Sequence, residues 1–158
     1  MSKVKAAAEE AKKQYVSFML AGEQHGVDVV RVQEIKGWDL VTRVPSTPTY
    51  VLGVINLRGA IVPVIDLRIR FRLERAPYGS TTVVVVVRVP GERGERTVGL
   101  VVDAVNSVHD IAPSAIRPPP ALPGTVDHAF IEGIAVVGGK LMLLLDVQAL
   151  VTASIEEG

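Results

Sequence analysis

The chain has 158 residues, no cysteine, and 17 Lys and Arg balanced by 17 Asp and Glu. Hydrophobic residues make up 48% of the sequence and aromatic residues only 4%, which predicts a globular fold with an aliphatic core. The absence of cysteine excludes disulfides, thiolate metal sites and cysteine nucleophiles. The zero net charge argues against nucleic-acid binding, and apolar runs such as Val83 to Val87 are far shorter than the ~20 residues of a membrane helix.

The N-terminal residues predict a leader followed by a hairpin. Residues 1–14 form the expected flexible leader, because lysines and glutamates surround an alanine cluster that contains no secretory apolar stretch. Alternation from Tyr15 to Leu20, a turn at 21–24 and a returning segment at 25–30 indicate two paired strands.

The period of the apolar residues changes after this hairpin. Val29, Val32 and Ile35 recur at every third position, which predicts a short helical turn. Gly37 suits the C-terminal end of such a turn.

The most hydrophobic part of the first half is a second hairpin. Residues 50–57 and 60–67 are nearly continuous apolar runs on either side of Arg58 and Gly59, which indicates strands buried on both faces. Asp66 ends the second run and can cap a short helical turn that begins at Leu67.

Residues 76–80 mark the expected boundary between two halves of one domain, at about 15–76 and 81–151, and residues 152–158 are expected to form a tail. Apolar runs and turn residues in the second half predict further strands, a charged solvent loop and a capped C-terminal helix. The strands are expected at 81–89, 96–102, 103–111, 130–137 and 140–145, the loop at 90–95, and the helix at 147–151 after Asp146.

About ten short strands with few helices predict an all-β fold. With about five strands in each half, we expect two five-stranded barrels packed together, with short helical turns and a short C-terminal helix. Closure of each barrel would remove the exposed edges that valine-rich strands otherwise offer for aggregation.

The residues that could support catalysis or metal binding do not form a recognisable motif. His25, His109 and His128 lack the spacing of metal ligands, and the sequence contains neither a nucleophile elbow nor a phosphate-binding loop. Asp66, Asp103 and Asp146 each end an apolar strand, where we expect them to cap the following segment. The sequence therefore favours a binding module without a cofactor over an enzyme.

Two charged residues lie in apolar surroundings. Glu34 lies among the apolar residues of the predicted helical turn, and Arg58 lies at the tip of the most hydrophobic hairpin. The planar guanidinium of Arg58 suits a contact with a carboxylate, either within the molecule or on a partner, and the more common alternative is a solvated arginine in a turn.

Several stretches resemble the CheW family of chemotaxis coupling proteins, and they follow one another in the order found in that family. They are Gly26-Val27-Asp28, Val32-Gln33-Glu34-Ile35, the hairpin Asn56-Leu57-Arg58-Gly59, Gly99-Leu100-Val101-Val102-Asp103 and Leu143-Leu144-Leu145-Asp146. The resemblance covers residues 15–151. The charged 90–95 loop looks longer than in close relatives, and Trp38 stands where we expect a different aromatic residue.

The resemblance implies two SH3-like barrels and a non-catalytic adaptor that is a monomer when free. Its implied partners are the regulatory domain of the histidine autokinase CheA and the cytoplasmic tips of methyl-accepting chemotaxis receptors. It also implies a cytoplasmic protein that is recruited to receptor arrays without inserting into the membrane. The implied receptor-binding residues are Val29, Val32, Glu34, Val83, Val105 and Val108, and the implied kinase-binding residues are Gly53, Val54, Arg58 and Gly59. With these sites in view, we expect Glu34 and Arg58 to pair and to hold the predicted helical turn against the hairpin.

Two alternatives remain open from the sequence. The same scaffold could serve a parallel chemosensory pathway, such as one for surface motility. The chain could instead be a small-barrel enzyme or ligand-binding domain, which requires a concave site with converging polar groups.

Overall fold

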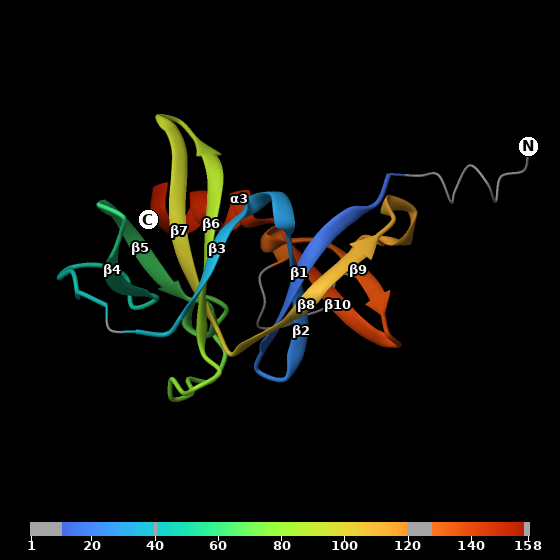
Figure 1. The fold of residues 1–158 in the computed structure, drawn as a ribbon, viewed down its shortest axis with the longest axis horizontal. Coiled ribbons are helices and arrows are strands. Elements are labelled where there is room, and N and C mark those ends of the chain that lie inside the picture. Colours follow the sequence, from blue (N-terminus) through green and yellow to red (C-terminus); the bar gives the residue numbers. More distant parts are fainter. Residues whose placement is uncertain (1–10, 40, 120–127, 157–158) are drawn as a thin grey trace, which may run out of the picture.

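The structure, a computed structural model, describes residues 11–39, 41–119 and 128–156 (Figure 1). Ten strands dominate it: β1 (Lys13–Leu20), β2 (Glu23–Asp28), β3 (Val32–Gly37), β4 (Val51–Leu57), β5 (Ala60–Asp66), β6 (Val83–Gly91), β7 (Gly94–Val102), β8 (Ala104–Ile111), β9 (Ile131–Val137) and β10 (Lys140–Leu145). The helical segments are short: η1 (Val29–Arg31), α2 (Leu67–Arg70), η2 (Pro113–Ala115), η3 (His128–Phe130), α3 (Val147–Val151) and the π-helical η4 (Thr152–Glu156).

The strands form two five-stranded sheets that lie side by side in Figure 1. The first sheet has the order β8-β1-β2-β10-β9, and the second has the order β3-β6-β7-β5-β4. The all-β prediction is confirmed. The assignment of one sheet to each half of the sequence is wrong, because β1 and β2 cross over to pair with strands of the second half.

The two sheets have the same internal topology. In each sheet an outer strand is followed by a connector, a hairpin, a capping aspartate and a short helix, and one pair of central strands is parallel: β2 with β10, and β5 with β7. Asp66 caps α2 and Asp146 caps α3, each through a carboxylate oxygen that accepts backbone N–H groups. Both of these predicted caps are confirmed.

Neither sheet is a barrel closed by its strands, since the outer strands of each share no ladder within the described residues. A connector instead pairs with the outer strand of each sheet through one isolated bridge. Thr42 pairs with Val54 of β4, and Arg117 pairs with Ile134 of β9. Through these bridges the connectors partly close each sheet into a barrel.

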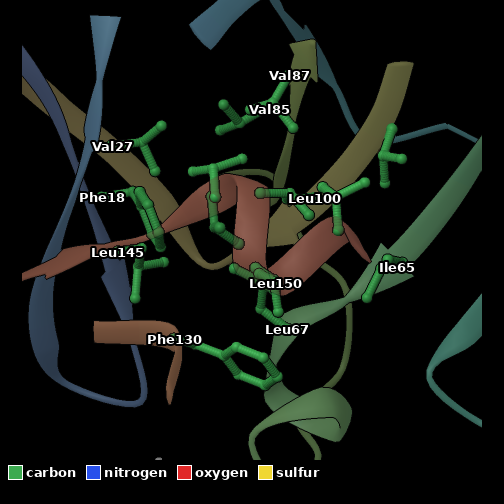
Figure 2. Packing of buried hydrophobic residues seen from close by; sticks show 14 of the residues in the cluster. Phe18, Val27, Ile65, Leu67, Val85, Val87, Leu100, Phe130, Leu145 and Leu150 are labelled. Atoms are coloured by element: carbon green, nitrogen blue, oxygen red, sulfur yellow. The ribbon is translucent and has the colours of Figure 1, made fainter. Parts of the chain in front are cut away.

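A shared core lies between the two sheets (Figure 2). The first sheet contributes Phe18 and Val27, the second contributes Ile65 and Leu100, and Leu150 of α3 packs among them. Two smaller clusters lie within the individual sheets: Leu57, Val62, Val64, Val84, Val86 and Val101 in one, and Tyr15, Ile111, Ala135, Met142 and Leu144 in the other. The shared core makes the two sheets one packed unit.

Three local predictions need correction. The predicted helical turn at 29–37 is only the three residues of η1, and strand β3 runs to Gly37. The 90–95 loop is a tight hairpin, because β6 extends to Gly91 and β7 starts at Gly94. The hairpin at 50–67 is not buried on both faces, since Ile61 on β5 is 66% exposed.

The ends of the domain also differ from the expected boundaries. Strand β1 starts at Lys13, inside the expected leader, whose residues 1–10 lie outside the described chain. The expected tail continues α3 as a helical turn through Glu156, and Ala153 and Ile155 pack against the shared core.

Candidate functional site

The hairpin turn between β4 and β5 presents Arg58 in a fixed orientation. Arg58 and Gly59 both have positive φ values, 51° and 88°, as a two-residue hairpin turn of type I′ requires. The side-chain oxygen of Asn56 accepts the N–H of Gly59 at 2.8 Å, which holds the turn closed. Asn56 and Gly59 therefore stabilise the conformation of this turn.

Arg58 pairs with Glu34, as predicted. The Nη1 atom of Arg58 lies 2.6 Å from Oε1 of Glu34, and the two side chains are 71% and 24% exposed. Glu34 lies on β3 and Arg58 follows β4, and these are the two outer strands of the second sheet. The pair therefore links opposite edges of that sheet, and it holds a strand rather than the predicted helical turn.

The structure brings the predicted kinase-binding residues together at the outer edge of the second sheet. We name Gly53, Val54, Arg58 and Gly59 the β4 surface. Thr42 and Val54 exchange two backbone hydrogen bonds, of 2.9 Å and 2.8 Å. Gly53 has a φ of 152°, and a Cβ atom there would collide with the carbonyl oxygen of Thr42, so only glycine fits.

The predicted receptor-binding valines gather near the junction of the two sheets. Val32, Val83 and Val105 are partly buried and pack against the shared core, whereas Val108 on β8 is 52% exposed. Val29 lies in η1, which contacts both β1 and β6. Glu34 is directed to Arg58 and the β4 surface, so the structure separates its carboxylate from the valines.

Two exposed apolar residues beside these valines are not among the predicted site residues. Val30, in η1, is 81% exposed, and Ile35, on β3, is 42% exposed. The carboxylate of Asp28 accepts the N–H of Val30 at 3.0 Å and fixes this turn. Correct assignment of β3 as a strand would have placed Ile35 on the face opposite Glu34. We name Val29, Val30, Val32, Ile35, Val83, Val105 and Val108 the junction surface.

An arginine–aspartate pair holds the sheets together near this junction. Arg68 makes two hydrogen bonds with the carboxylate of Asp103, of 2.8 Å and 2.6 Å, and Asp103 also accepts the N–H of Ala21 at 2.8 Å. Burial opposes ionisation of Asp103, but the hydrogen bonds from Arg68 and Ala21 lower its pKa. The prediction that Asp103 caps the next segment is wrong, because its partners lie far away in the sequence.

His25 is a buried structural residue. Its ring is stacked between those of Phe18 and Phe71, with centroid distances of 5.6 Å and 6.4 Å. Its Nδ1 atom lies 3.1 Å from the carbonyl oxygen of Glu23, whereas Nε2 has no hydrogen-bond partner among the described residues. Burial lowers the pKa of His25, so the ring is neutral inside the protein.

One serine–histidine contact has the composition of a nucleophile and its base, but its surroundings exclude that chemistry. Ser17 Oγ lies 3.0 Å from Nε2 of His109. The hydroxyl of Ser17 donates to the carbonyl of Ser107 and accepts the N–H of Ser107, so its proton is already engaged. Ser17 is fully buried and cannot reach a substrate. This cluster holds β1 against β8 at a register shift between them.

The described residues contain neither a candidate metal site nor a candidate membrane-spanning helix. No three His, Asp or Glu side chains there are grouped as they would be around a metal ion. No helix within those ranges has the length and hydropathy to cross a bilayer.

Comparison with known proteins connects this geometry to one family. The family model described as CheW-like domain matches residues 14–154. The chemotaxis protein CheW of Klebsiella aerogenes is 38% identical over 149 residues, which are 94% of this chain and 87% of the relative. Protein FrzA of Myxococcus xanthus is 29% identical over 85% of this chain and 81% of its own length.

A solved structure supports the same relationship. The crystal structure of the scaffolding protein TtCheW from Thermoanaerobacter tengcongensis superposes with a TM-score of 0.78 at 38% identity, over 86% of this chain and 85% of that one. The sequence resemblance and the fold therefore agree over nearly the whole domain. The chain belongs to the CheW family.

Proposed function

We propose that this chain is a chemotaxis adaptor that couples methyl-accepting chemotaxis receptors to the histidine autokinase CheA, so that receptors control kinase activity. The observation that carries this conclusion is the CheW-like match over residues 14–154, which includes both surfaces described above. The protein acts by contact, as a scaffold without catalysis, and works in the cytoplasm at receptor arrays. When free of its partners it is a monomer.

The β4 surface binds the regulatory domain of CheA. An outer strand with a rigid hairpin turn offers backbone and apolar contacts to another β-domain. The pair of Arg58 with Glu34 keeps the turn in one position, and Gly53 lets the connector lie against β4 without a side chain between them. The exposed ion pair contributes only about 0–1 kcal/mol to stability, so its role is to fix geometry.

The junction surface binds the cytoplasmic tip of the receptor. Such a tip is a helical hairpin, and its apolar stripe suits a surface of aliphatic side chains. Val30 and Val108 are the most exposed valines of this surface, and Val108 belongs to the first sheet whereas Val30 lies in η1, which leads into β3 of the second. A helix that contacts both would therefore span the junction between the two sheets.

The test is a pull-down from a lysate of the native host with two variants of the full chain. Arg58→Glu repels Glu34, so we expect kinase capture to fall at least tenfold while receptors are retained. Val108→Arg places a charge on the junction surface, so we expect receptor capture to fall while the kinase is retained. Both side chains are exposed, and the free energy of unfolding of each variant should therefore stay within about 1 kcal/mol of wild type.

Matched controls are available on the same molecule. Arg93→Glu changes an exposed arginine in the β6–β7 turn, and Val136→Arg changes an exposed valine on β9, the opposite edge of the first sheet from β8. Arg93→Glu should leave the kinase bound, and Val136→Arg should leave the receptors bound. Capture of neither a kinase nor receptors by wild type would refute the adaptor function, whereas unchanged capture by the variants would refute only the assigned surfaces.

A second candidate is the same scaffold in a parallel pathway, such as one for surface motility. The similarity to protein FrzA supports this candidate, because that relative does not carry the name chemotaxis protein. The receptors recovered in the same pull-down distinguish the two pathways. A small-barrel enzyme or ligand-binding domain would instead require turnover or a tightly bound metabolite.

A further inference from the structure

A cavity of about 590 Å³ lies beside the β4 surface, and the adaptor function described above does not use it. It is an open cleft bordered by the connector between β3 and β4, the first residues of β4, α2 and the segment that follows α2. We name it the Trp38 pocket. Its lining residues are Trp38, Val41, Arg43, Val44, Thr47, Val51, Leu52, Ile69, Arg75 and Tyr78, with Ser46, Pro48 and Thr49 of the connector.

Two aromatic rings form a fixed wall of this pocket. The rings of Trp38 and Tyr78 lie 4.2 Å apart between centroids, tilted by 31°. The hydroxyl of Tyr78 donates to the buried carboxylate of Asp66 at 2.5 Å, and the backbone N–H of Trp38 donates to the carbonyl of Thr82 at 3.1 Å. This wall is therefore organised before any ligand arrives, which lowers the entropic cost of binding.

The pocket also carries positive charge that the described residues do not neutralise. Arg43 and Arg75 line it, and both guanidinium groups act electrostatically on the phenol of Tyr78. Neither arginine makes a hydrogen bond or an ion pair with another described residue, and no aspartate or glutamate in the described ranges lines the pocket. The nearby carboxylate of Asp66 is engaged by Tyr78 and by the N–H groups of α2.

We propose that the Trp38 pocket binds an acidic segment of a partner polypeptide. Carboxylates of the segment pair with Arg43 and Arg75, whose planar guanidinium groups suit such contacts. An aliphatic side chain next to a carboxylate packs on Trp38 and Tyr78. Binding of an acidic segment in the Trp38 pocket is a separate proposal from kinase binding at the β4 surface. It does not depend on which protein binds to the β4 surface.

The shape and chemistry of the pocket favour a peptide over a small inorganic anion. Its volume falls in the roughly 300–1,000 Å³ range of clefts that hold ligands of several functional groups. A bare phosphate would pair with the arginines but would leave Val41, Leu52 and Ile69 uncovered. A segment with alternating acidic and aliphatic residues satisfies both parts of the lining.

Trp38 is the only tryptophan of the chain, so its fluorescence reports directly on the pocket. The full-length protein is titrated with the blocked pentapeptide Leu-Glu-Leu-Glu-Leu, and the emission of Trp38 is followed. We expect a saturable shift that weakens as sodium chloride is raised, because the contacts are between exposed charges. A matched peptide with glutamine in place of glutamate should bind at least tenfold more weakly.

Two variants test the assigned contacts. Arg43→Gln and Arg75→Gln each remove one charged hydrogen-bond donor, and each should weaken binding of the acidic peptide by about tenfold or more. Arg93→Gln, in the distant β6–β7 turn, should leave the affinity unchanged. Urea unfolding of each variant shows whether the fold is intact. We expect an intact fold, because Arg43 and Arg75 are both exposed.

Four results would overturn the proposal. They are the lack of a saturable response, an equal response to the glutamine peptide, full affinity in the double variant Arg43→Gln/Arg75→Gln, and the same response with inorganic phosphate alone. None of these results bears on capture of a kinase or receptor through the other two surfaces. Failure of this proposal is therefore distinguishable from failure of the adaptor function.

Discussion

The role of individual side chains in this protein depends on whether their partners are local or distant. Asp66 and Asp146 bind N–H groups within three residues, and the sequence predicts both as caps. Asp103 occupies a similar position after a strand, but it binds Arg68, 35 residues away. A pattern of neighbouring residues indicates a local cap, and it carries no information about a partner that only the fold brings near. The pair of Glu34 and Arg58 is predictable because both charges lie in apolar surroundings.

His25 leads to a prediction about pH. Its pKa in the folded protein lies below the ordinary value of 6.5, because burial between Phe18 and Phe71 disfavours the charged ring. The unfolded chain therefore binds more protons than the folded protein below pH 6.5, and stability falls as the pH drops through that range. The carboxylate of Asp103 and the backbone at Glu23 favour the charged ring, but burial outweighs them.

We expect the free energy of unfolding in urea to be about 1 kcal/mol lower at pH 5.5 than at pH 7.5 through this residue. In His25→Phe the difference in the free energy of unfolding between the two pH values should be smaller by this amount, because phenylalanine does not titrate. This expectation holds whatever the substitution does to the stability at pH 7.5. Asp103 does not complicate the comparison, since its pKa is lowered from 3.8 and it stays ionised throughout. An unchanged pH dependence in His25→Phe would show that His25 does not titrate in this way.

At the scale of elements, the sequence indicates nearly every strand except β3. The strands are visible from apolar runs and from turn residues such as Gly138 and Gly139, whose φ values are positive. In β3 the three-residue spacing of Val29, Val32 and Ile35 predicts a helix, although Ile35 is an outward-facing residue of an outer strand. The spacing of apolar residues predicts the wrong secondary structure where exposed positions of a strand are also apolar.

The connector bridge at Gly53 gives a prediction about one element. Gly53→Ala would place a Cβ atom against the carbonyl oxygen of Thr42, far inside van der Waals contact, so the bridge to β4 must break or shift. We expect the free energy of unfolding to fall by more than about 2 kcal/mol, measured by urea denaturation. Kinase capture should fall as well, because the β4 surface depends on this bridge.

Gly37→Ala is the matched control for this substitution. Gly37 lies on β3 of the same sheet, and a Cβ atom added there would have no heavy atom of another segment within 4 Å. Its stability should stay within about 1 kcal/mol of wild type. Equal effects of the two substitutions would mean that close approach to Thr42 is not what requires glycine at position 53.

At the scale of the whole molecule, the two sheets are joined by more than their apolar core. The guanidinium of Arg70 lies over the rings of Tyr50 and Phe130, 4.9 Å and 4.6 Å from their centroids, and Nε donates to the hydroxyl of Ser154 at 2.7 Å. Tyr50 and Phe130 occupy equivalent positions before the first hairpin strand of each sheet. Arg70 thus joins corresponding points of the two sheets.

Because the sheets exchange strands across the sequence, we predict that neither half folds alone. A fragment of residues 1–80 contains β1 and β2 without their partners β8 and β10, and β3 to β5 without β6 and β7. The circular dichroism and amide NMR spectra of this fragment should be those of an unfolded chain. Mixing the fragment with a second fragment of residues 81–158 should restore the native spectra. A cooperatively folded 1–80 fragment would contradict the interleaved arrangement. The sequence does not predict this exchange, because strand pairing between distant segments leaves no local pattern.

The position of β1 and β2 at one end of the chain and β9 and β10 at the other has a consequence during translation. The second sheet can assemble as soon as β7 has left the ribosome, but the first sheet needs β10, the last strand to be made. Phe18 and Leu20 of β1 therefore lack their complete packing until residues 21–145 have been synthesised, and a nascent chain that exposes apolar side chains in this way is prone to aggregate or to bind chaperones.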